Sequence, residues 1–568
     1  MRNDSGTITS AAANVLPAAA WLAACQSPSP EFSASLSAIY GNDEANLTRR
    51  TALVEHGLHC FLDLYGNQPV QVLRAPGRVN LRGMHVDTHG GWLNLMTHQR
   101  EVVVIAAPRA DQQFQFHNAD PGYSPVEVAA EPFLMLPAFL GAWSAFLQSE
   151  LVCNHIQERR GHWGLYLLGC VLRAHHAAPG RPLLGMNAVV ASDLPCGASL
   201  SSSAALCVAV LLAILGRNEI SLADDALILA ARDAEWFTGA RTGTGDQTAV
   251  VCGRRGQILN VAVLTEDFEL SSARHVPFPA ALDLLIINSF TERSLSGNDL
   301  LNYTRNRFAY SIALDVLRQE MLRAGFPEEQ VHHLDRLSKM TPDRFESRCD
   351  LYSLLQRVPE TISLSQLRHK YELPELDAHY QKYFGLISQA SRPESIALRG
   401  PLLFALTESE RARVFPGLLQ AGAFEAAGAC MLLGHDGDRV SWGGGTPWRS
   451  MEVTNDALER LAVANTPLAQ VPGVYGASSL ILDALVDCAM SAGALGACLT
   501  GAGIAGSVLA LCPKDFTARV QHAVRTLLAS PVYLRLTGRT KSLTEGQLAE
   551  AAVINHAPVG AGKLPLPC

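Results

Sequence analysis

The segment Asp193 to Ala205, with the sequence DLPCGASLSSSAA, constrains the fold of this chain more than any other stretch. It follows Val189 to Ala191, which is typical of a buried strand, and it leads into the long apolar run Ala204 to Leu215, which is typical of a helix. Small residues let the backbone approach a ligand, and a helix start offers unpaired N–H groups and the positive end of a dipole. We therefore expect this serine loop to bind phosphate, without a Walker A lysine because no Gly-Lys-Ser/Thr follows.

Two carboxylates, Glu235 and Asp246, follow the serine loop on either side of the turn-rich segment Thr238 to Gly245. A carboxylate on a glycine-flanked turn can point into a cleft and act as a base, and a second one beside a serine loop can hold magnesium. The alternative for either acid alone is a solvated surface charge.

Composition narrows the class of protein. The chain has 568 residues, of which 48% are hydrophobic and 17% charged, so it has ample material for buried cores. A net charge of −8 argues against a general nucleic-acid binder, and no stretch reaches the roughly 18 apolar residues of a membrane span. The 13 cysteines include no CxxC pair, which indicates reduced thiols and a cytoplasmic location. Leu22 to Cys25 resembles a lipoprotein cleavage box, but the residues before it make a poor signal peptide.

Composition shifts also suggest how the chain is divided. Residues 1–33 are rich in Ala, Ser and Pro and are expected to form a loose leader. Residues 34–275 and 276–568 are expected to form an N-terminal and a C-terminal domain, with a helical, charged insertion at about 325–395. In the first of these we expect a strand beginning near Val70 and ending in a turn at Pro76-Gly77, and another strand over Glu101 to Ala107.

Three segments resemble, in order, the signatures of the GHMP small-molecule kinases. They are RAPGRVNLRGMHVDTHGG (Arg74 to Gly91), DLPCGASLSSSAAL (Asp193 to Leu206) and LTGAGIAGSVLAL (Leu499 to Leu511). The first is similar to the sugar signature of the galactokinase family. The resemblance implies an α+β fold. More specifically, it implies a two-domain GHMP-kinase-like fold with the active site in the interdomain cleft. It also implies ATP-dependent phosphorylation of the anomeric C1 hydroxyl of galactose or a related aldose.

The same resemblance implies roles for individual residues. Asp246 would face the anomeric hydroxyl, and Arg78 would keep it ionised and stabilise charge during transfer. Ser203 and Glu235 would bind Mg²⁺. Asp87 and His85 would form hydrogen bonds with the sugar hydroxyls. The ATP-binding residues would be Pro195, Gly197, Ala198, Ser199, Leu200, Ser201, Ser202 and Ser203, together with Gly501 and Gly503 of the glycine loop Thr500 to Gly506.

The chain also departs from the family pattern. Met84 stands where the family has a glutamate that receives the C6 hydroxyl, and a thioether cannot replace that acceptor. Arg82 stands where an aliphatic residue is usual, so it would pair with a uronate if it points inward, or be solvated on the outer side of the strand. Gly243 and Gly245 add flexibility that would displace Asp246.

These departures leave several functions open. A galacturonate- or arabinose-type 1-kinase would not need the missing glutamate. A mevalonate- or heptose-type kinase of the same superfamily is a further alternative, against which Asp87, Gly90-Gly91 and Asp246-Gln247 favour the galactokinase branch. A non-catalytic sensor of sugar and ATP would keep the pocket and lose the transfer residues, whereas Arg78, Glu235 and Asp246 all remain here.

Overall fold

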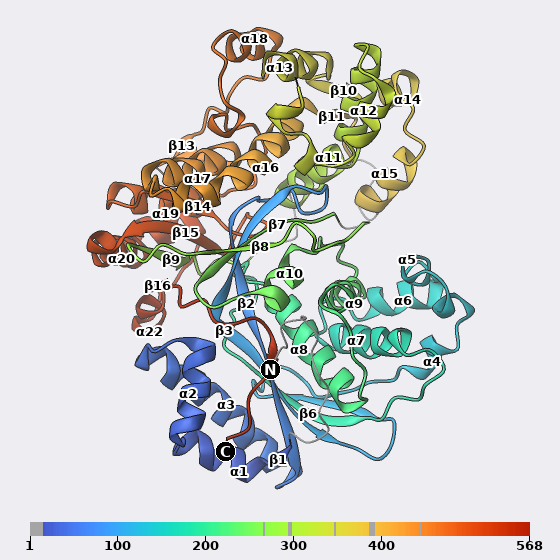
Figure 1. The fold of residues 1–568 in the computed structure, drawn as a ribbon, viewed down its shortest axis with the longest axis vertical. Coiled ribbons are helices and arrows are strands. Elements are labelled where there is room, and N and C mark those ends of the chain that lie inside the picture. Colours follow the sequence, from blue (N-terminus) through green and yellow to red (C-terminus); the bar gives the residue numbers. More distant parts are fainter. Residues whose placement is uncertain are drawn as a thin grey trace.

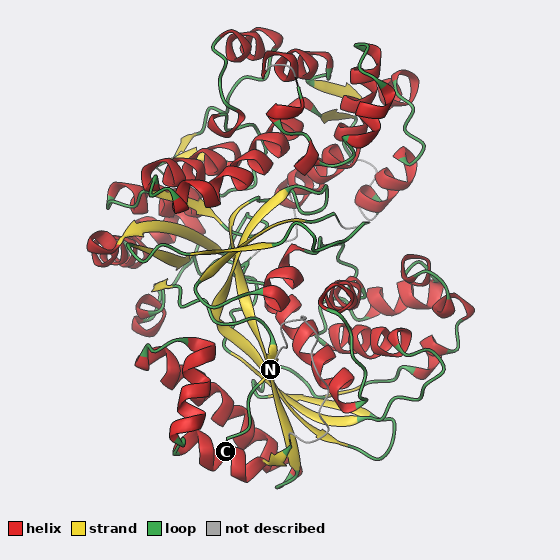
Figure 2. Cartoon of the chain, in the orientation of Figure 1, coloured by secondary structure: helices red, strands yellow, loops and turns green. Residues whose placement is uncertain are grey.

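The computed structural model describes residues 15–264, 267–292, 298–345, 348–385, 392–443 and 445–567. Two long antiparallel strands, β2 (Pro69–Arg82) and β3 (Trp92–Pro108), run through the middle of the molecule. They belong to a nine-stranded sheet, and a four-stranded sheet lies beside their upper ends in Figure 1. Figure 2 shows helices on both sides of these strands, so the expected α+β architecture is confirmed.

The nine-stranded sheet has the path β1-β2-β3-β6-β4-β5, with β17 on β2, β7 on β3 and β8 on β7. The shorter strands are β1 (Leu16–Pro17), β4 (Phe114–Asn118), β5 (Val126–Glu127), β6 (Met186–Ser192), β7 (Gln257–Ala262), β8 (Arg274–Pro277) and β17 (Gly562–Lys563). The run over Glu101 to Ala107 lies within β3, as predicted. From Val102 onward the run is apolar because both faces are covered: Val102 and Val104 belong to one core, and Val103 and Ile105 to another.

Helices cover both faces of this sheet. On one side lie α1 (Ala18–Gln26), α2 (Pro30–Tyr40) and α3 (Glu44–Tyr65). On the other lie α7 (Gly164–Ala177), α8 (Ser202–Arg217), α9 (Asp224–Trp236) and α10 (Gly245–Cys252). Short helices beyond α7 form a separate aromatic cluster, and they are α4 (Glu131–Leu134), η1 (Pro137–Leu140), α5 (Trp143–Phe146) and α6 (Glu150–Glu158).

The prediction of a loose leader over residues 1–33 is wrong for the part that is described. Residues 18–26 and 30–40 are helical, Trp21 and Phe32 are buried, and their rings meet edge to face with centroids 6.2 Å apart. Trp21 and Cys25 lie one turn apart on the same helix face, so an alanine-rich segment gains a buried stripe. The cysteine of the lipoprotein-like box is thus part of a folded core, and residues 1–14 lie outside the described residues.

The predicted turn at Pro76-Gly77 is also wrong, because β2 continues through it with a register shift against β3. Gly77 is needed here, since a Cβ would lie 2.5 Å from Leu194 Cδ2 and 2.7 Å from the Leu200 carbonyl oxygen. The next residue, Arg78, donates its backbone N–H to that carbonyl at 3.1 Å. The bulge therefore brings the serine loop against β2.

The four-stranded sheet is antiparallel throughout, in the order β14-β15-β9-β16. Its strands are β9 (Leu282–Asn288), β14 (Gly496–Leu499), β15 (Ser507–Pro513) and β16 (Ala552–Ile554). The helices around it are α16 (Arg399–Gln420), α17 (Phe424–Asp438), α19 (Leu480–Ser491), α20 (Lys514–Ala529), α21 (Pro531–Thr537) and α22 (Glu545–Ala549).

The expected insertion is a helical lobe at the top of Figure 1 that shares one hydrophobic core with α16. Its elements and neighbours are α11 (Asn298–Arg323), α12 (Glu328–His333), η2 (Leu337–Lys339), η3 (Pro342–Arg344), α13 (Arg348–Arg357), β10 (Thr361–Ser363), α14 (Leu364–Lys370), α15 (Leu376–Phe384), β11 (Ser395–Ala397), β12 (Ser441–Trp442), β13 (Thr446–Pro447), α18 (Asn455–Val463) and η5 (Leu468–Gln470). The lobe contacts the sugar signature, because Leu337 and Ser338 donate backbone N–H groups to the carbonyls of His89 and Gly90.

The chain passes from the nine-stranded sheet to the four-stranded sheet between Pro277, the end of β8, and Leu282, the start of β9. This crossing lies near the domain boundary expected at residue 276. The C-terminal segment departs from that division. Gly562 and Lys563 pair with β2, and Leu564 packs in the core under α1 to α3, so the last residues belong to the first sheet. Within the described ranges, no helix combines the length and apolar character that crossing a membrane requires.

Candidate functional site

An ion pair between Arg78 on β2 and Asp246 in the first turn of α10 lies at the centre of the site. Arg78 Nη2 is 2.6 Å and Nε 2.8 Å from Asp246 Oδ1, and Arg78 Nη1 donates to the Ser199 carbonyl at 2.6 Å. The Arg78 side chain is 8% exposed and that of Asp246 27%, so the carboxylate faces the open side of the pair. One guanidinium thus connects the strand, the acid and the serine loop.

The serine loop has an unusual backbone. Ser199 and Ser201 have φ angles of 60° and 62°, and Gly197 has a φ of 72°. Left-handed serines are strained, and such strain concentrates at ligand-binding loops. Ser201 precedes α8 without making a side-chain cap, and its buried hydroxyl lacks a hydrogen-bond partner among the described residues. This unfilled group at a helix start fits an incoming phosphate oxygen.

The glycine loop of the second sheet packs directly on the serine loop. A Cβ on Gly501 would lie 2.9 Å from Ser199 Cβ, and one on Gly506 would lie 2.7 Å from Ser199 Oγ. Ser507 Oγ also donates to the Ala198 carbonyl at 2.9 Å. Gly503 faces another way, because a Cβ there would lie 2.1 Å from the Ala477 carbonyl oxygen. Because Gly501 and Gly506 have no side chains, the glycine loop can pack directly on the serine loop.

Glu235, in the last turn of α9, is only 5% exposed and lies between two donors. Ser203 Oγ donates to its Oε1 and Gln247 Nε2 to its Oε2, each at 2.7 Å. Burial, followed by repulsion from Asp246, raises the pKa of Glu235 to about 7. Two converging oxygens in a site that disfavours an unpaired carboxylate fit Mg²⁺, which binds few protein oxygens and keeps water or phosphate as its other ligands.

His85 and Asp87 lie on the turn that follows β2, and both line the same cavity as Asp246. The His85 ring stacks on Tyr475 with centroids 4.3 Å apart, and its Nε2 is 3.5 Å from Asp438 Oδ1. Burial and the neighbouring Asp246 carboxylate raise the pKa of Asp87. The cavity between these groups is lined by Arg78, Asn80, His85, Asp87, Thr88, Leu93, Leu95, Thr242, Gly243, Gly245, Asp246, Arg307, Tyr475, Gly501 and Ala502.

The structure does not bring Met84 and Arg82 into this cavity, contrary to their prediction as substrate-binding residues. Met84 is 1% exposed and packs in the hydrophobic core. The Arg82 side chain lies 3.3 Å from Glu408 of α16 and donates to the Cys430 carbonyl at 2.9 Å. Arg82 is therefore neither solvated nor turned to the ligand, because a buried acid distant in the sequence neutralises it.

Glu408 also holds the turn itself. Its Oε1 accepts the backbone N–H groups of Gly83 and Met84 at 2.7 and 3.1 Å, and its Oε2 pairs with Arg411 at 2.9 Å. Sequence reasoning missed this residue, and it also missed Arg307 and Thr242 in the cavity wall. Val474-Tyr475-Gly476 resembles a tripeptide of the galactokinase family, but the sequence alone did not indicate a role for Tyr475. Its ring supplies the face on which His85 stacks.

Three family models match the chain in the order of these structural parts. The galactokinase galactose-binding signature matches residues 59–108, the GHMP kinases N terminal domain matches 166–254, and the GHMP kinases C terminal domain matches 454–529. The chain is therefore similar, in three successive regions, to the galactose-binding signature of galactokinases and to both domains of the GHMP kinases. The first model contains β2 and the turn with His85 and Asp87, and the second contains the serine loop, Glu235 and Asp246.

Similar proteins include galactokinases from bacteria and from a eukaryote. The Streptomyces coelicolor galactokinase is 26% identical over 475 residues, covering 83% of this chain and 92% of the relative. The Dictyostelium discoideum galactokinase is 25% identical over 88% of this chain and 91% of its own. The Roseiflexus sp. galactokinase is 30% identical over 262 residues, 46% of this chain, and the match spans 58% of that relative's length.

Among solved structures, the Lactococcus lactis galactokinase complexed with galactose resembles the chain with a TM-score of 0.57 and 17% sequence identity. The match covers 89% of this chain and 98% of that chain. This likeness shows that the chain has the GHMP kinase fold.

Proposed function

We propose that the chain is an ATP-dependent sugar 1-kinase, which transfers the γ-phosphoryl group of ATP to the anomeric C1 hydroxyl of galactose or a closely related aldose. One observation carries this proposal: the Arg78 guanidinium contacts both the Asp246 carboxylate in the cavity and the Ser199 carbonyl in the serine loop. A sugar in the cavity and a nucleotide on the loop would therefore meet at this pair.

The nucleotide is proposed to bind with its phosphates over Gly197 to Ser203. Support comes from the left-handed serines, the unfilled Ser201 hydroxyl and the start of α8, which all favour an anion. Gly501 of the second sheet closes the loop from the other side. Ser203 and Glu235 are proposed to hold Mg²⁺, which would neutralise charge on the phosphates when it is bound.

In the proposed reaction, the C1 oxygen forms a bond to the γ-phosphorus while the bond from that phosphorus to the bridging oxygen of ADP breaks. Asp246 orients the hydroxyl by accepting its hydrogen bond and takes up its proton as the new bond forms. Arg78 keeps Asp246 ionised and stabilises negative charge on the transferring group. These roles require positioning more than strong basicity, which suits an acid paired with an arginine.

The substrate is proposed to be held by Asp87 and His85 through its hydroxyls. Galactose follows from the resemblance to galactokinases, and a galacturonate-type 1-kinase is a second candidate because Arg307 is among the residues that line the cavity. Met84 and Arg82 carry no part of this choice, since neither lines the cavity. We also propose two domains that meet at this site, and a cytoplasmic location, where ATP is available and where thiols such as those of the described cysteines stay reduced.

A transfer assay with labelled ATP over galactose, galacturonate, arabinose and fucose tests the proposal. The expected product is a sugar 1-phosphate, identified by ³¹P coupling to the anomeric proton in NMR. Transfer to another hydroxyl would contradict C1 chemistry. If no sugar accepts phosphate while calorimetry still detects sugar binding, the chain is a sensor and the proposed kinase activity is wrong.

A further inference from the structure

A second cavity, of about 420 Å³, lies between α3, β3 and the segment that follows α22, away from the site described above. A smaller cavity of about 240 Å³ adjoins it and shares five lining residues, which are Asn46, Arg49, Gln99, Glu550 and Val553. We call the two together the α3 groove. None of the described residues that line it lines the cavity around Asp246.

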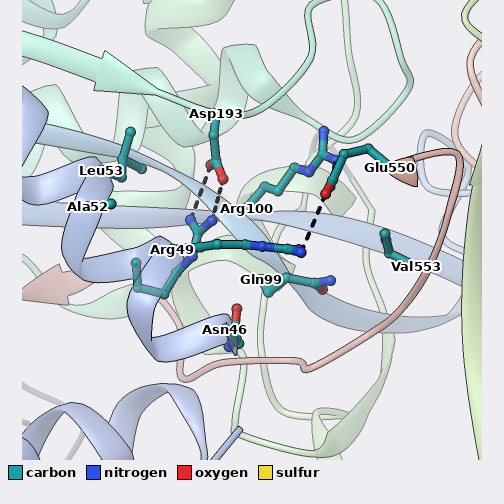
Figure 3. A pocket seen from close by; sticks show the side chains of 10 residues that line it. Asn46, Arg49, Ala52, Leu53, Gln99, Arg100, Asp193, Glu550 and Val553 are labelled. Atoms are coloured by element: carbon teal, nitrogen blue, oxygen red, sulfur yellow. Dashed lines mark hydrogen bonds and ion pairs between the residues drawn. The ribbon is translucent and has the colours of Figure 1, made fainter. Parts of the chain in front are cut away.

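Arginines dominate the walls of the α3 groove. Arg49, Arg50 and Arg100 line the larger cavity, and Arg525 lines the smaller one. Arg49 Nη2 is 3.4 Å and Arg100 Nη2 2.7 Å from the carboxylate of Glu550, so one acid is shared by two guanidinium groups. Figure 3 shows Arg49 and Arg100 together with the carboxylates of Asp193 and Glu550 in the larger cavity. With Asp43 in the smaller cavity, the groove holds four arginines and three carboxylates, so it has a small positive excess on a chain with a net charge of −8.

Asp193 neutralises Arg50 and leaves Arg49 and Arg100 to share Glu550. Both of its oxygens pair with Arg50, and Oδ1 also accepts the Glu101 backbone N–H at 2.9 Å. The Arg50 side chain is 3% exposed, yet its Nε lacks a hydrogen-bond partner in the described part of the chain. Arg525 Nε in the smaller cavity is likewise buried without such a partner there. Buried donors of this kind normally have a partner, so these two arginines are held in an unusual environment.

We propose that the α3 groove binds a small molecule that carries a phosphate group, with Arg49 and Arg100 as its principal ligands. A guanidinium binds phosphate oxygens in a bidentate manner, and a dianion would satisfy two arginines that now share one carboxylate. A monocarboxylate would only repeat the charge that Glu550 provides. Ala52, Leu53 and Val553 form an apolar wall for the organic part of an ester, and the volume falls within the range of small-molecule sites.

Calorimetry on the full chain with galactose 1-phosphate, ribose 5-phosphate and inorganic phosphate tests this site. The double variant Arg49→Gln/Arg100→Gln is expected to bind the esters at least about tenfold more weakly. Arg449→Gln changes an arginine that is 90% exposed and lies outside the groove, so it serves as the matched control and should bind as the parent does. Melting temperatures of all variants show whether each one is folded.

Glu550→Gln distinguishes a ligand site from a structural ion pair. If Glu550 occupies the place of the phosphate, its neutralisation should tighten ester binding about threefold or more; if it only holds the arginines in place, binding should weaken. Weaker binding in Glu550→Gln, equal binding in the double arginine variant, or no saturable binding by the parent chain would each overturn the proposal. Tighter binding of the esters than of inorganic phosphate would assign the groove to esters, and equal binding would assign it to free phosphate.

Discussion

Asp87 occupies the space that a side chain at residue 243 would need: a Cβ on Gly243 would lie 2.1 Å from Asp87 Oδ2 and 2.6 Å from its Cγ. Gly243, three residues before Asp246, thus stands where any larger side chain would collide with Asp87. It allows the carboxylate of the sugar signature to pack against the turn that carries Asp246, so the two acids share one cavity.

Gly243→Ala is expected to displace Asp87 and to lower kcat/KM for the sugar by about a hundredfold, because a shift of about 1 Å in a positioned group has this effect. Affinity for ATP should stay near that of the parent, since the serine loop is not contacted. Gly417→Ala, at a position with nothing within 4 Å of the new Cβ, is the control and should remain fully active. Equal activity in both variants would show that the close packing on Asp87 is unimportant.

Asp246→Asn should lower single-turnover phosphoryl transfer by about 10²–10⁴-fold, which is the usual contribution of a positioned general base. The amide keeps the shape of the side chain and removes the charge that pairs with Arg78. Calorimetry with a non-hydrolysable ATP analogue is expected to give an unchanged affinity. A variant that turns over like the parent would remove Asp246 from the reaction.

Glu235 makes magnesium binding depend on pH. With a pKa of about 7 in the absence of metal, it is protonated below neutrality and must lose that proton to bind a cation. The apparent affinity for Mg²⁺ should therefore rise about tenfold between about pH 6 and about pH 8, with protons released on binding. Glu235→Gln should bind Mg²⁺ weakly and without this pH dependence.

The same group affects stability in the metal-free protein. Its folded-state pKa is raised, so its contribution to stability is fully present below the unfolded value of about 4.5 and is lost as the pH rises through about 7. Metal-free melting temperatures should accordingly fall over that range by more in the parent chain than in Glu235→Gln. Parallel curves would contradict the raised pKa.

Met84→Glu is expected to lower the free energy of unfolding by several kcal/mol, on the order of the cost of burying an unpaired carboxylate. It should not shift preference toward a sugar with a C6 hydroxyl, because Met84 packs in the core. Met84→Leu, which conserves volume, should cost less than about 1.5 kcal/mol. Denaturant titrations and a sugar panel measure both effects, and a stable Glu variant with altered preference would contradict this placement.

Much of the architecture could be predicted from local patterns. The β-branched run of β3, the strand–loop–helix arrangement around the serine loop and the order of the three glycine-containing segments are all legible in the sequence. The grouping of Arg78, Asp246 and Ser199 was also predicted, through the resemblance of their three segments to family motifs. The helices of the N-terminal segment were missed because composition was considered without the spacing of Trp21 and Cys25.

Other features depend on partners that are distant in the sequence. Arg82 is buried because Glu408 neutralises it from α16, and nothing near Arg82 indicates that partner. Pro76-Gly77 has the composition of a turn, and only the approach of Leu194 and Leu200 makes it a bulge. The groove at Arg49 and Arg100 depends on Glu550, which returns from the far end of the chain.

Strand β2, which carries Arg78, is flanked by β1 from the beginning of the described chain and by β17 from its end. Arg74 on that strand donates to the carbonyls of Val559 and Gly560 at 2.9 and 2.8 Å. During translation, these partners emerge from the ribosome long after β2 itself. A polypeptide that stops short of Val559 consequently lacks these contacts to the strand that bears Arg78.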